Sequence, residues 1–265
     1  MKLGIIGCGN MGSALVEGVI SKRILPFNRI FISDKDPHKT KRLNRKFGPR
    51  ISSTEDIGKN CDFIIIAVKP QDSKNVIAKI SENLSARKHL VSIMAGVTLK
   101  KLENLAEKKI AITRVMPNIA ALVGKSMTVL CHNKLVRDKA VVNRVLSSIG
   151  EVIEIDERHM DAATAVVGSG PAYFFYLAEH LRDAAMKLGI KKDIALRLAL
   201  FTLVGSGALA EALPETPESL RARITSGKGT TEAALKVLVR KEFKKVMHEA
   251  VRAAAKRSKE LSMGA

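Results

Sequence analysis

A glycine-rich motif near the amino terminus constrains the fold of this chain more than any other feature. Gly7, Gly9 and Gly12 form a Gly-x-Gly-x-x-Gly pattern between a β-branched run at residues 3–6 and a helical pattern at residues 11–23. In this context the first glycine permits a tight turn, the second lets a pyrophosphate approach the backbone, and the third allows close helix–strand packing. The helix amino terminus then faces the phosphates. The residues expected to contact a dinucleotide here are Gly7, Gly9, Asn10, Met11 and Gly12.

Strand-like and helical segments alternate through the first 155 residues. The expected strands are residues 3–6, 29–33, 62–68, 89–94, 110–115, 126–130 and 152–155, and the expected helices are 11–23, 37–47, 71–83, 98–107 and 136–149. Alternation at this spacing predicts parallel strands joined by right-handed crossovers. The run from Phe63 to Val68 has no polar alternation, as in a strand covered on both faces. The predicted fold class is therefore α/β, with a Rossmann-type doubly wound sheet.

The pattern changes after residue 155, and only helical periodicity remains. The expected helices are residues 171–188, 192–212, 217–224 and 230–262. Residues 194–213 are apolar nearly all round apart from Arg197 and Glu211, unlike a surface helix. We therefore expect a dinucleotide-binding domain at 1–155 and an all-helical domain at 156–265 that packs against a second copy of itself. The alternative is a core helix shielded by its own chain.

Composition excludes several classes of protein. Cys8, Cys61 and Cys131 are far apart and form no Cys-x-x-Cys pair, which argues against a disulfide framework and a zinc site and favours a reducing, cytoplasmic setting. No metal is expected. The run from Phe63 to Val68 is much shorter than the roughly 20 residues that cross a bilayer, and no signal-peptide pattern is visible. We therefore expect no membrane association.

The formal charge of +19 raises the question of nucleic-acid binding. The basic residues are scattered singly or in pairs, and Phe and Tyr together supply only ten aromatic side chains for base stacking. The charge is better explained by solvated surfaces that attract anionic small molecules, so a nucleic-acid partner is not expected.

The end of the second predicted strand carries mixed evidence on the cofactor. Ser33, Asp34 and Lys35 lie there, with Asp34 22 residues beyond Gly12. An acid at this point normally accepts hydrogen bonds from the adenosine ribose and favours NADH. However, Lys35, Lys39 and Arg42 are close enough in sequence to neutralise the 2′-phosphate of NADPH. The sequence leaves NADPH and NADH both open, and a plain surface turn at Asp34 also.

Three further strand ends are expected along the same ligand crevice. They carry Ala67-Val68-Lys69-Pro70, Ala95-Gly96 and the segment Arg114-Val115-Met116-Pro117-Asn118. Lys69 could hold a phosphate, orient a nicotinamide or be a surface lysine, and residues 114–118 could form an ordinary proline turn.

Two glycine-containing segments in the helical half, residues 168–173 and 225–231, each precede a predicted helix. Free N–H groups at a helix start form a natural seat for a carboxylate. Thr230 or Thr231 could alternatively serve only as a helix N-cap.

Taken together, these motifs resemble pyrroline-5-carboxylate reductase, the last enzyme of proline biosynthesis. The resemblance runs through Ala-Val-Lys-Pro-Gln, Met-Ala-Gly, Arg-Val-Met-Pro-Asn, Gly-Ser-Gly-Pro-Ala-Tyr and the late Gly-Thr-Thr, and covers essentially the whole chain. It implies reduction of a cyclic imine by NADPH or NADH, and a homodimer formed by the helical domain that can associate further. It also implies an active site between the cofactor crevice and the helical loop, with a contribution from the partner subunit.

The resemblance assigns roles to particular residues. Besides the glycine motif, the implied cofactor contacts are Ser33, Asp34, Lys35, Ala67, Val68, Lys69, Pro70, Ala95 and Gly96. The implied substrate contacts are Met116, Asn118, Gly229, Thr230 and Thr231, with Thr231 and Lys69 as the candidate catalytic residues. This chain departs from the family pattern at Gly227 and Lys228, where the family usually has proline and glycine.

Two other functions stay open at this stage. One is a reductase of another small acid, similar to β-hydroxyacid dehydrogenases, which need a catalytic lysine in the second domain; Lys187 and Lys191 are candidates by residue type only. The other is a non-enzymatic protein that senses nucleotides or associates with nucleic acid through its basic amino-terminal half.

Overall fold

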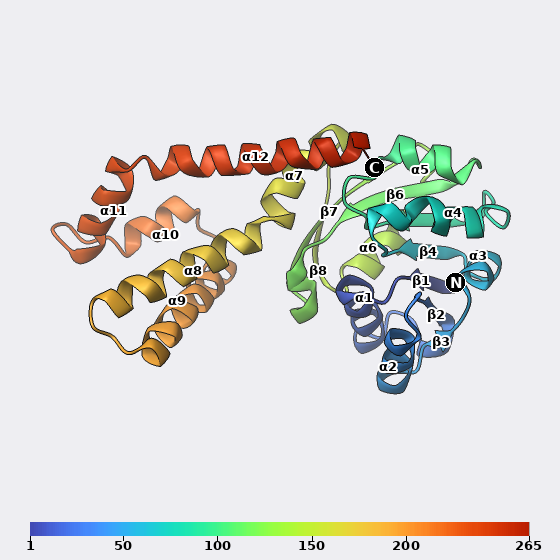
Figure 1. Ribbon diagram of the computed structural model, residues 1–265, viewed down its shortest axis with the longest axis horizontal. Helices are drawn as coiled ribbons and strands as arrows, with labels where there is room; N and C mark the ends of the chain where they lie inside the picture. The colour runs from blue at the N-terminus through green and yellow to red at the C-terminus, as the bar shows by residue number, and fades with distance from the viewer. Residues whose placement is uncertain (265) are drawn as a thin grey trace. The chain divides into compact units, whose positions relative to one another are not determined.

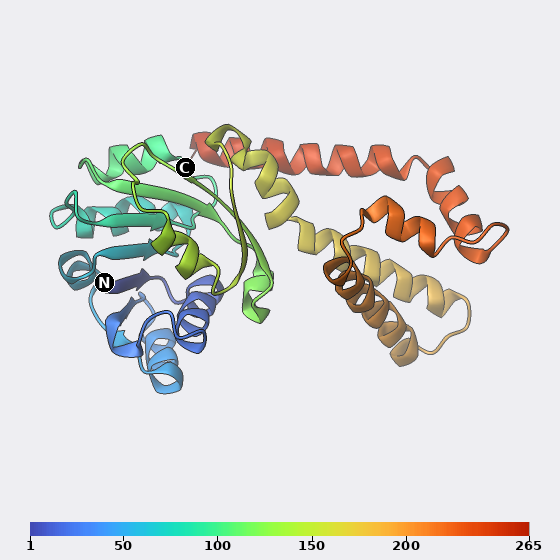
Figure 2. The same ribbon diagram turned by 180° about the vertical axis from the view of Figure 1, so that it is seen from behind.

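The computed structural model describes residues 1–264, and the chain divides into two compact units. The first unit comprises Met1–Ser169 together with Ala253–Ala265, and the second comprises Gly170–Arg252. Figures 1 and 2 show strands in the first unit and helices alone in the second. The expected domain boundary after residue 155 stays a prediction, because a compact unit need not coincide with a unit that folds by itself.

The first unit is built on one eight-stranded sheet with the order β3-β2-β1-β4-β5-β6-β7-β8. The strands are β1 (Leu3–Ile6), β2 (Ile30–Ser33), β3 (Arg50–Ile51), β4 (Phe63–Ile66), β5 (His89–Ser92), β6 (Ala111–Met116), β7 (Ser126–His132) and β8 (Gly150–Glu154). The strand order reverses between β1 and β4, which is the switch point where such sheets bind ligands. This confirms the predicted α/β class and the doubly wound sheet.

Helices cover both faces of the sheet. Along β4, Phe63 and Ile65 pack into one core and Ile64 and Ile66 into the other, so every side chain of the strand is buried. The first core takes side chains from α1 (Asn10–Ser21), α2 (Pro37–Phe47) and α6 (Ala140–Leu146), and the second from α3 (Thr54–Asn60), α4 (Ser73–Ser81), α5 (Leu99–Ala106) and α7 (Met160–Ala163). The apolar run in the sequence reflects this double covering.

Strand β7 pairs with β6 in antiparallel orientation, whereas the other neighbouring strands of the described sheet pair in parallel. The connection between them contains only the short 3₁₀ helix η3 (Ile119–Val123). A parallel crossover needs about a dozen residues or more, so this short link reverses the chain direction.

Several local elements differ from the sequence prediction. Strand β3 and helix α3 were not expected, because two exposed strand residues and a seven-residue polar helix give no periodic signal. The single helix predicted at residues 230–262 is wrong: α11 (Thr230–Arg240) ends and α12 (Phe243–Gly264) begins across Lys241 and Glu242. Glu242 has φ +53°, and the sequence has no glycine or proline there to reveal the break.

The second unit contains α8 (Gly170–Lys187), α9 (Lys192–Ala212), α10 (Pro217–Arg223), α11 and the first part of α12. Its own packing buries little: on α9 only Ala195 and Ala199 are buried, while Phe201 is 71% exposed. By length and composition alone α9 is long and apolar enough to cross a membrane, and 11% of its apolar window is buried. The sequence analysis compared only the run from Phe63 to Val68 with the length of a membrane span and did not consider this helix.

A chain of hydrogen bonds buried in the sheet predicts acid sensitivity. Thr113 Oγ1 lies 2.7 Å from His89 Nε2 and 2.8 Å from His132 Nδ1. Burial, followed by the charge of His132, lowers the pKa of His89 to about 4, and burial also lowers the pKa of His132. In the unfolded chain these rings titrate near about 6.5, so between about pH 6.5 and about pH 4 the unfolded state binds more protons.

The stabilising contribution of the two neutral histidines should therefore be fully present above about pH 7. It should fall as the pH decreases toward about 4. Urea unfolding at about pH 7.5 and about pH 5 should differ by about 1–2 kcal/mol. His89→Gln should remove most of this difference, because glutamine does not titrate. An equal pH dependence in the variant would assign the effect to other groups.

Candidate active site

The glycine-rich loop joins β1 to α1 at the sheet's switch point. Gly7 has φ +103°, a backbone conformation that favours glycine, and its N–H donates to Ser33 O at 2.7 Å. A Cβ on Gly12 would lie 1.9 Å from Gly7 O, so only glycine lets the helix approach this closely. At Gly9 a Cβ would meet no protein atom within 4 Å. The loop thus has the tight turn, the close packing and the open face that its sequence predicts.

The start of α1 offers a seat for phosphate. Its N-cap, Gly9, has no side chain to accept a hydrogen bond, and the first turn contains no acidic residue. The first helical N–H to find a partner is that of Ser13, which donates to Gly9 O at 2.9 Å. Within the described chain, the N–H groups of Asn10, Met11 and Gly12 donate no hydrogen bond. Oriented N–H donors and a positive helix end suit a pyrophosphate, so the predicted residues fit a dinucleotide here.

The acid at the end of β2 is largely buried, and its role toward a ribose stays a prediction. The Asp34 side chain is only 7% exposed, and its Oδ2 accepts from Cys8 N–H at 2.6 Å. Oδ1 accepts from Asp36 N–H at 2.8 Å. Lys35, whose side chain is 80% exposed, pairs instead with Asp72 at 3.3 Å. Asp34 is therefore bound to the glycine-rich loop itself.

The structure brings the ends of β4 and β5 to the same edge of the sheet as the glycine-rich loop. Ala67 N–H donates to Ile6 O at 2.7 Å, which holds the start of the Ala67–Pro70 segment against β1. Lys69 is exposed and caps the 3₁₀ helix η2 (Pro70–Asp72). Gly96 has φ +75°, and a Cβ there would lie 3.1 Å from Leu261 Cβ of α12. The Ala95-Gly96 turn is therefore packed against the end of the chain.

The end of β6 places Met116 and Asn118 at that edge. Asn118 is the N-cap of η3: its Oδ1 accepts from Ala120 N–H at 3.1 Å, and its own N–H donates to Ser126 Oγ at 3.0 Å. A Cβ on Gly168 would lie 2.6 Å from Met116 Cε, so Gly168 gives Met116 its space.

Arg114 serves a different purpose from the one its place in the crevice motif suggested. Its side chain is 5% exposed and contacts Glu157 at 3.2 Å and Asp161 at 3.7 Å. Glu157 also accepts from Leu99 N–H at 2.7 Å, and Asp161 accepts from Ser258 Oγ at 2.7 Å. Arg114 thus links β6, α5, α7 and the end of α12. The signal in the sequence was a cation inside the apolar strand Ile112–Val115, but nothing there named its partners.

The loop at residues 225–231, in the second unit, forms the other predicted site. Gly229 is the N-cap of α11 and has no capping side chain. Within the described chain, the N–H groups of Thr230 and Thr231 donate no hydrogen bond. Thr231 is half-buried and Thr230 exposed. Lys228, at the position of the family's glycine, has φ +63°, and its N–H donates to Glu232 Oε2 at 2.6 Å. Neither threonine is the N-cap.

The second glycine segment, residues 168–173, forms no open loop. Helical backbone continues from α7 through the π-helical turn η5 (Thr164–Gly168) into α8, and Ser169 N–H donates to Thr164 O at 3.2 Å. The expectation of a carboxylate seat at this segment is wrong, because its amide groups take part in the helix.

The sheet, its switch point and the glycine-rich loop define a dinucleotide-binding domain of the Rossmann class. A family model described as "NADP oxidoreductase coenzyme F420-dependent" matches residues 2–96, and one described as "Pyrroline-5-carboxylate reductase dimerisation" matches residues 157–261. The pyrroline-5-carboxylate reductases of Arabidopsis thaliana and Synechocystis are 35% and 36% identical to this chain, each over 98% of it and over 95% and 98% of their own length. The chain belongs to the pyrroline-5-carboxylate reductase family.

Solved structures agree with this assignment. A pyrroline-5-carboxylate reductase from Coxiella burnetii superposes with a TM-score of 0.94 at 32% identity, covering 98% of both chains. The pyrroline carboxylate reductase of Plasmodium falciparum, solved with NADP bound, gives a TM-score of 0.85 at 35% identity over 99% of this chain and 98% of its own. The predicted fold class, family and use of a nicotinamide cofactor are confirmed.

Proposed function

We propose that this protein reduces 1-pyrroline-5-carboxylate to L-proline with NADPH or NADH. The observation that carries the proposal is full-length family membership combined with an open, uncapped phosphate seat at Gly9. The exposed Lys187 and Lys191 lie at the end of α8 and the start of α9, and nothing there favours a β-hydroxyacid dehydrogenase reaction. In the proposed reaction the bound dihydronicotinamide supplies a hydride to the protonated imine.

The chain's own residues then have mainly to bind and orient. The N–H groups at the start of α1 hold the pyrophosphate, and the segments at Ala67–Pro70 and Ala95-Gly96 border the nicotinamide half. The N–H groups of Thr230 and Thr231 hold the substrate carboxylate beside Gly229, whose own N–H donates to Ser226 O at 3.0 Å. Met116 and Asn118 lie beside the ring. An iminium accepts hydride without a strong acid, so positioning supplies most of the rate. The Thr231 hydroxyl, or a water it holds, hydrogen-bonds the ring nitrogen, and Lys69 provides a cation near the cofactor.

Purified protein should oxidise NADPH or NADH when the five-membered imine is added. Thr231→Ala should lower kcat/KM by about 10–100-fold, or about 1.4–2.7 kcal/mol, because a hydrogen bond to the reacting nitrogen is lost. Cofactor affinity should change little, and Thr231→Ser should recover most of the rate because it keeps the hydroxyl. Wild-type protein inactive on the imine would overturn the proposed reaction, and an unimpaired Thr231→Ala variant would overturn the role of Thr231.

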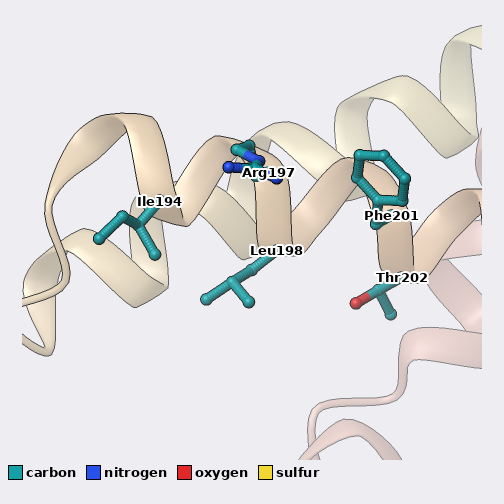
Figure 3. Close-up of a pocket in the computed structure, with 5 residues that line it drawn as sticks. All are labelled: Ile194, Arg197, Leu198, Phe201 and Thr202. Carbon is teal, nitrogen blue, oxygen red and sulfur yellow. The ribbon is translucent and has the colours of Figure 1, made fainter.

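The exposed apolar side chains of the helical unit support a homodimer as the working form. Figure 3 shows Ile194, Leu198 and Thr202 along one side of α9, with Phe201 nearby, and this helix lies within the segment matched by the dimerisation family. In such a dimer, a loop of the partner subunit would contribute to the active site. Sedimentation equilibrium distinguishes a dimer from a larger assembly. We further propose that the enzyme is cytoplasmic and has no membrane or nucleic-acid partner.

A further inference from the structure

The carboxylate of Asp34 is already committed within the protein. Each of its oxygens accepts a backbone N–H, from Cys8 at 2.6 Å and from Asp36 at 2.8 Å. Lys39 Nζ lies 3.9 Å from Asp34 Oδ1, and the Asp34 side chain is only 7% exposed. Each oxygen keeps a further lone pair, but so little of the side chain is exposed that a ribose hydroxyl has poor access to it. The bond to Cys8 instead ties the end of β2 to the residue between the first two glycines of the loop.

Helix α2 carries two cations close in sequence to the end of β2. Lys39 and Arg42 are three residues apart, which places them on one side of the helix. Burial is the main cause that raises the pKa of the Cys8 thiol to about 12; the Asp34 charge adds to this rise, and Lys39 and Arg42 oppose it. Lys39 Nζ lies 3.9 Å from Asp34 Oδ1, and Arg42 follows it by about one helical turn. Among the described residues no carboxylate forms an ion pair with Arg42, whereas Lys35 pairs with Asp72.

We propose that Asp34 is a positioning residue that braces the glycine-rich loop, and that Lys39 and Arg42 bind the 2′-phosphate, so that the enzyme prefers NADPH to NADH. The inference rests on the nicotinamide cofactor of the proposed function and adds the choice between its two forms. An acid that reads the ribose would repel a 2′-phosphate, but the Asp34 charge is offset by two N–H donors and Lys39. Arg42 then supplies a planar donor suited to phosphate.

Calorimetric titration of the wild-type protein with NADPH and NADH, without imine, tests the preference. NADPH should bind at least about 10-fold more tightly. The double variant Lys39→Ala/Arg42→Ala should lose about 10–100-fold in affinity for NADPH and no more than about 3-fold for NADH. Lys41→Ala/Arg45→Ala removes the same charge from two other exposed positions of α2 and should leave the ratio unchanged. Equal wild-type affinities, or equal losses in the two double variants, would overturn the selection.

A cofactor without the 2′-hydroxyl tests the brace. If Asp34 does not read the ribose, wild-type protein should bind NADH and 2′-deoxy-NADH within about 2-fold of each other. Asp34→Ala should weaken 2′-deoxy-NADH by about 10-fold, and Asp34→Asn by less, because asparagine keeps one acceptor oxygen. A wild-type loss of 10-fold or more on removing the hydroxyl, or an unchanged Asp34→Ala variant, would overturn the brace. Failure of the wild type to bind either natural cofactor would instead overturn the proposed function.

Discussion

Gly9→Ala is expected to weaken cofactor binding by about 100-fold, or about 2.7 kcal/mol, while the protein remains folded. The added methyl group would meet no protein atom within 4 Å, and Gly9 has φ −70°, which any residue adopts. The methyl group would, however, occupy the space through which a pyrophosphate approaches the backbone. Calorimetric titration with NADPH and NADH measures the loss, and urea unfolding should change by only about 0.5 kcal/mol.

Gly12→Ala is the matched comparison, because its methyl group would collide with Gly7 O at 1.9 Å. That contact is with backbone, so α1 must move away from β1, and we expect about 1–3 kcal/mol of lost stability together with lost binding. The two variants thus separate the two functions of the glycines. Tight cofactor binding by Gly9→Ala would contradict a phosphate seat at this helix start.

Much of the sheet could be predicted because its strands are short, apolar and regularly spaced. Leu3–Ile6 matches its prediction completely, and the strand predicted at 29–33 differs from β2 by one residue. A parallel sheet with helices on both faces leaves a strong periodic signal in each element. The strand order then placed the ends of β1, β2, β4, β5 and β6 along one edge of the sheet.

What the sequence could not predict depends on tertiary contacts. Helix α3 is short and contains Gly58, where a Cβ would lie 2.8 Å from Ile80 Cβ of α4. Close packing against α4 therefore stabilises this helix. The commitment of Asp34 to Cys8 N–H is likewise invisible in sequence, since an aspartate at a strand end reads the same whether it binds ribose or the loop. The continuous helix through Gly168 was masked by glycines that normally signal a loop.

The ion pairs of Arg114 with Glu157 and Asp161 also depend on tertiary contacts that the sequence does not reveal. Removing them has the largest expected effect on stability. Arg114→Met should lower the free energy of unfolding by about 2–4 kcal/mol, because the carboxylates of Glu157 and Asp161 lose their shared cation. These acids are 34% and 30% exposed, so water can partly replace the lost contact, which keeps the estimate below about 5 kcal/mol. Cofactor binding should also weaken, because Asp161 holds Ser258 of α12, and α12 packs on the Gly96 turn.

Arg158→Met is the matched control, since it removes an arginine whose ion pair with Asp156 is 76% and 68% exposed. A pair so exposed contributes about 0–1 kcal/mol, and this variant should unfold nearly as the wild type does. Urea denaturation gives both free energies, and hydrogen exchange near Ser258 should rise in Arg114→Met alone. Equal, small losses in the two variants would mean that the buried arginine does not hold the end of α12 to the sheet. The Gly96 turn would then depend on its direct packing against Leu261.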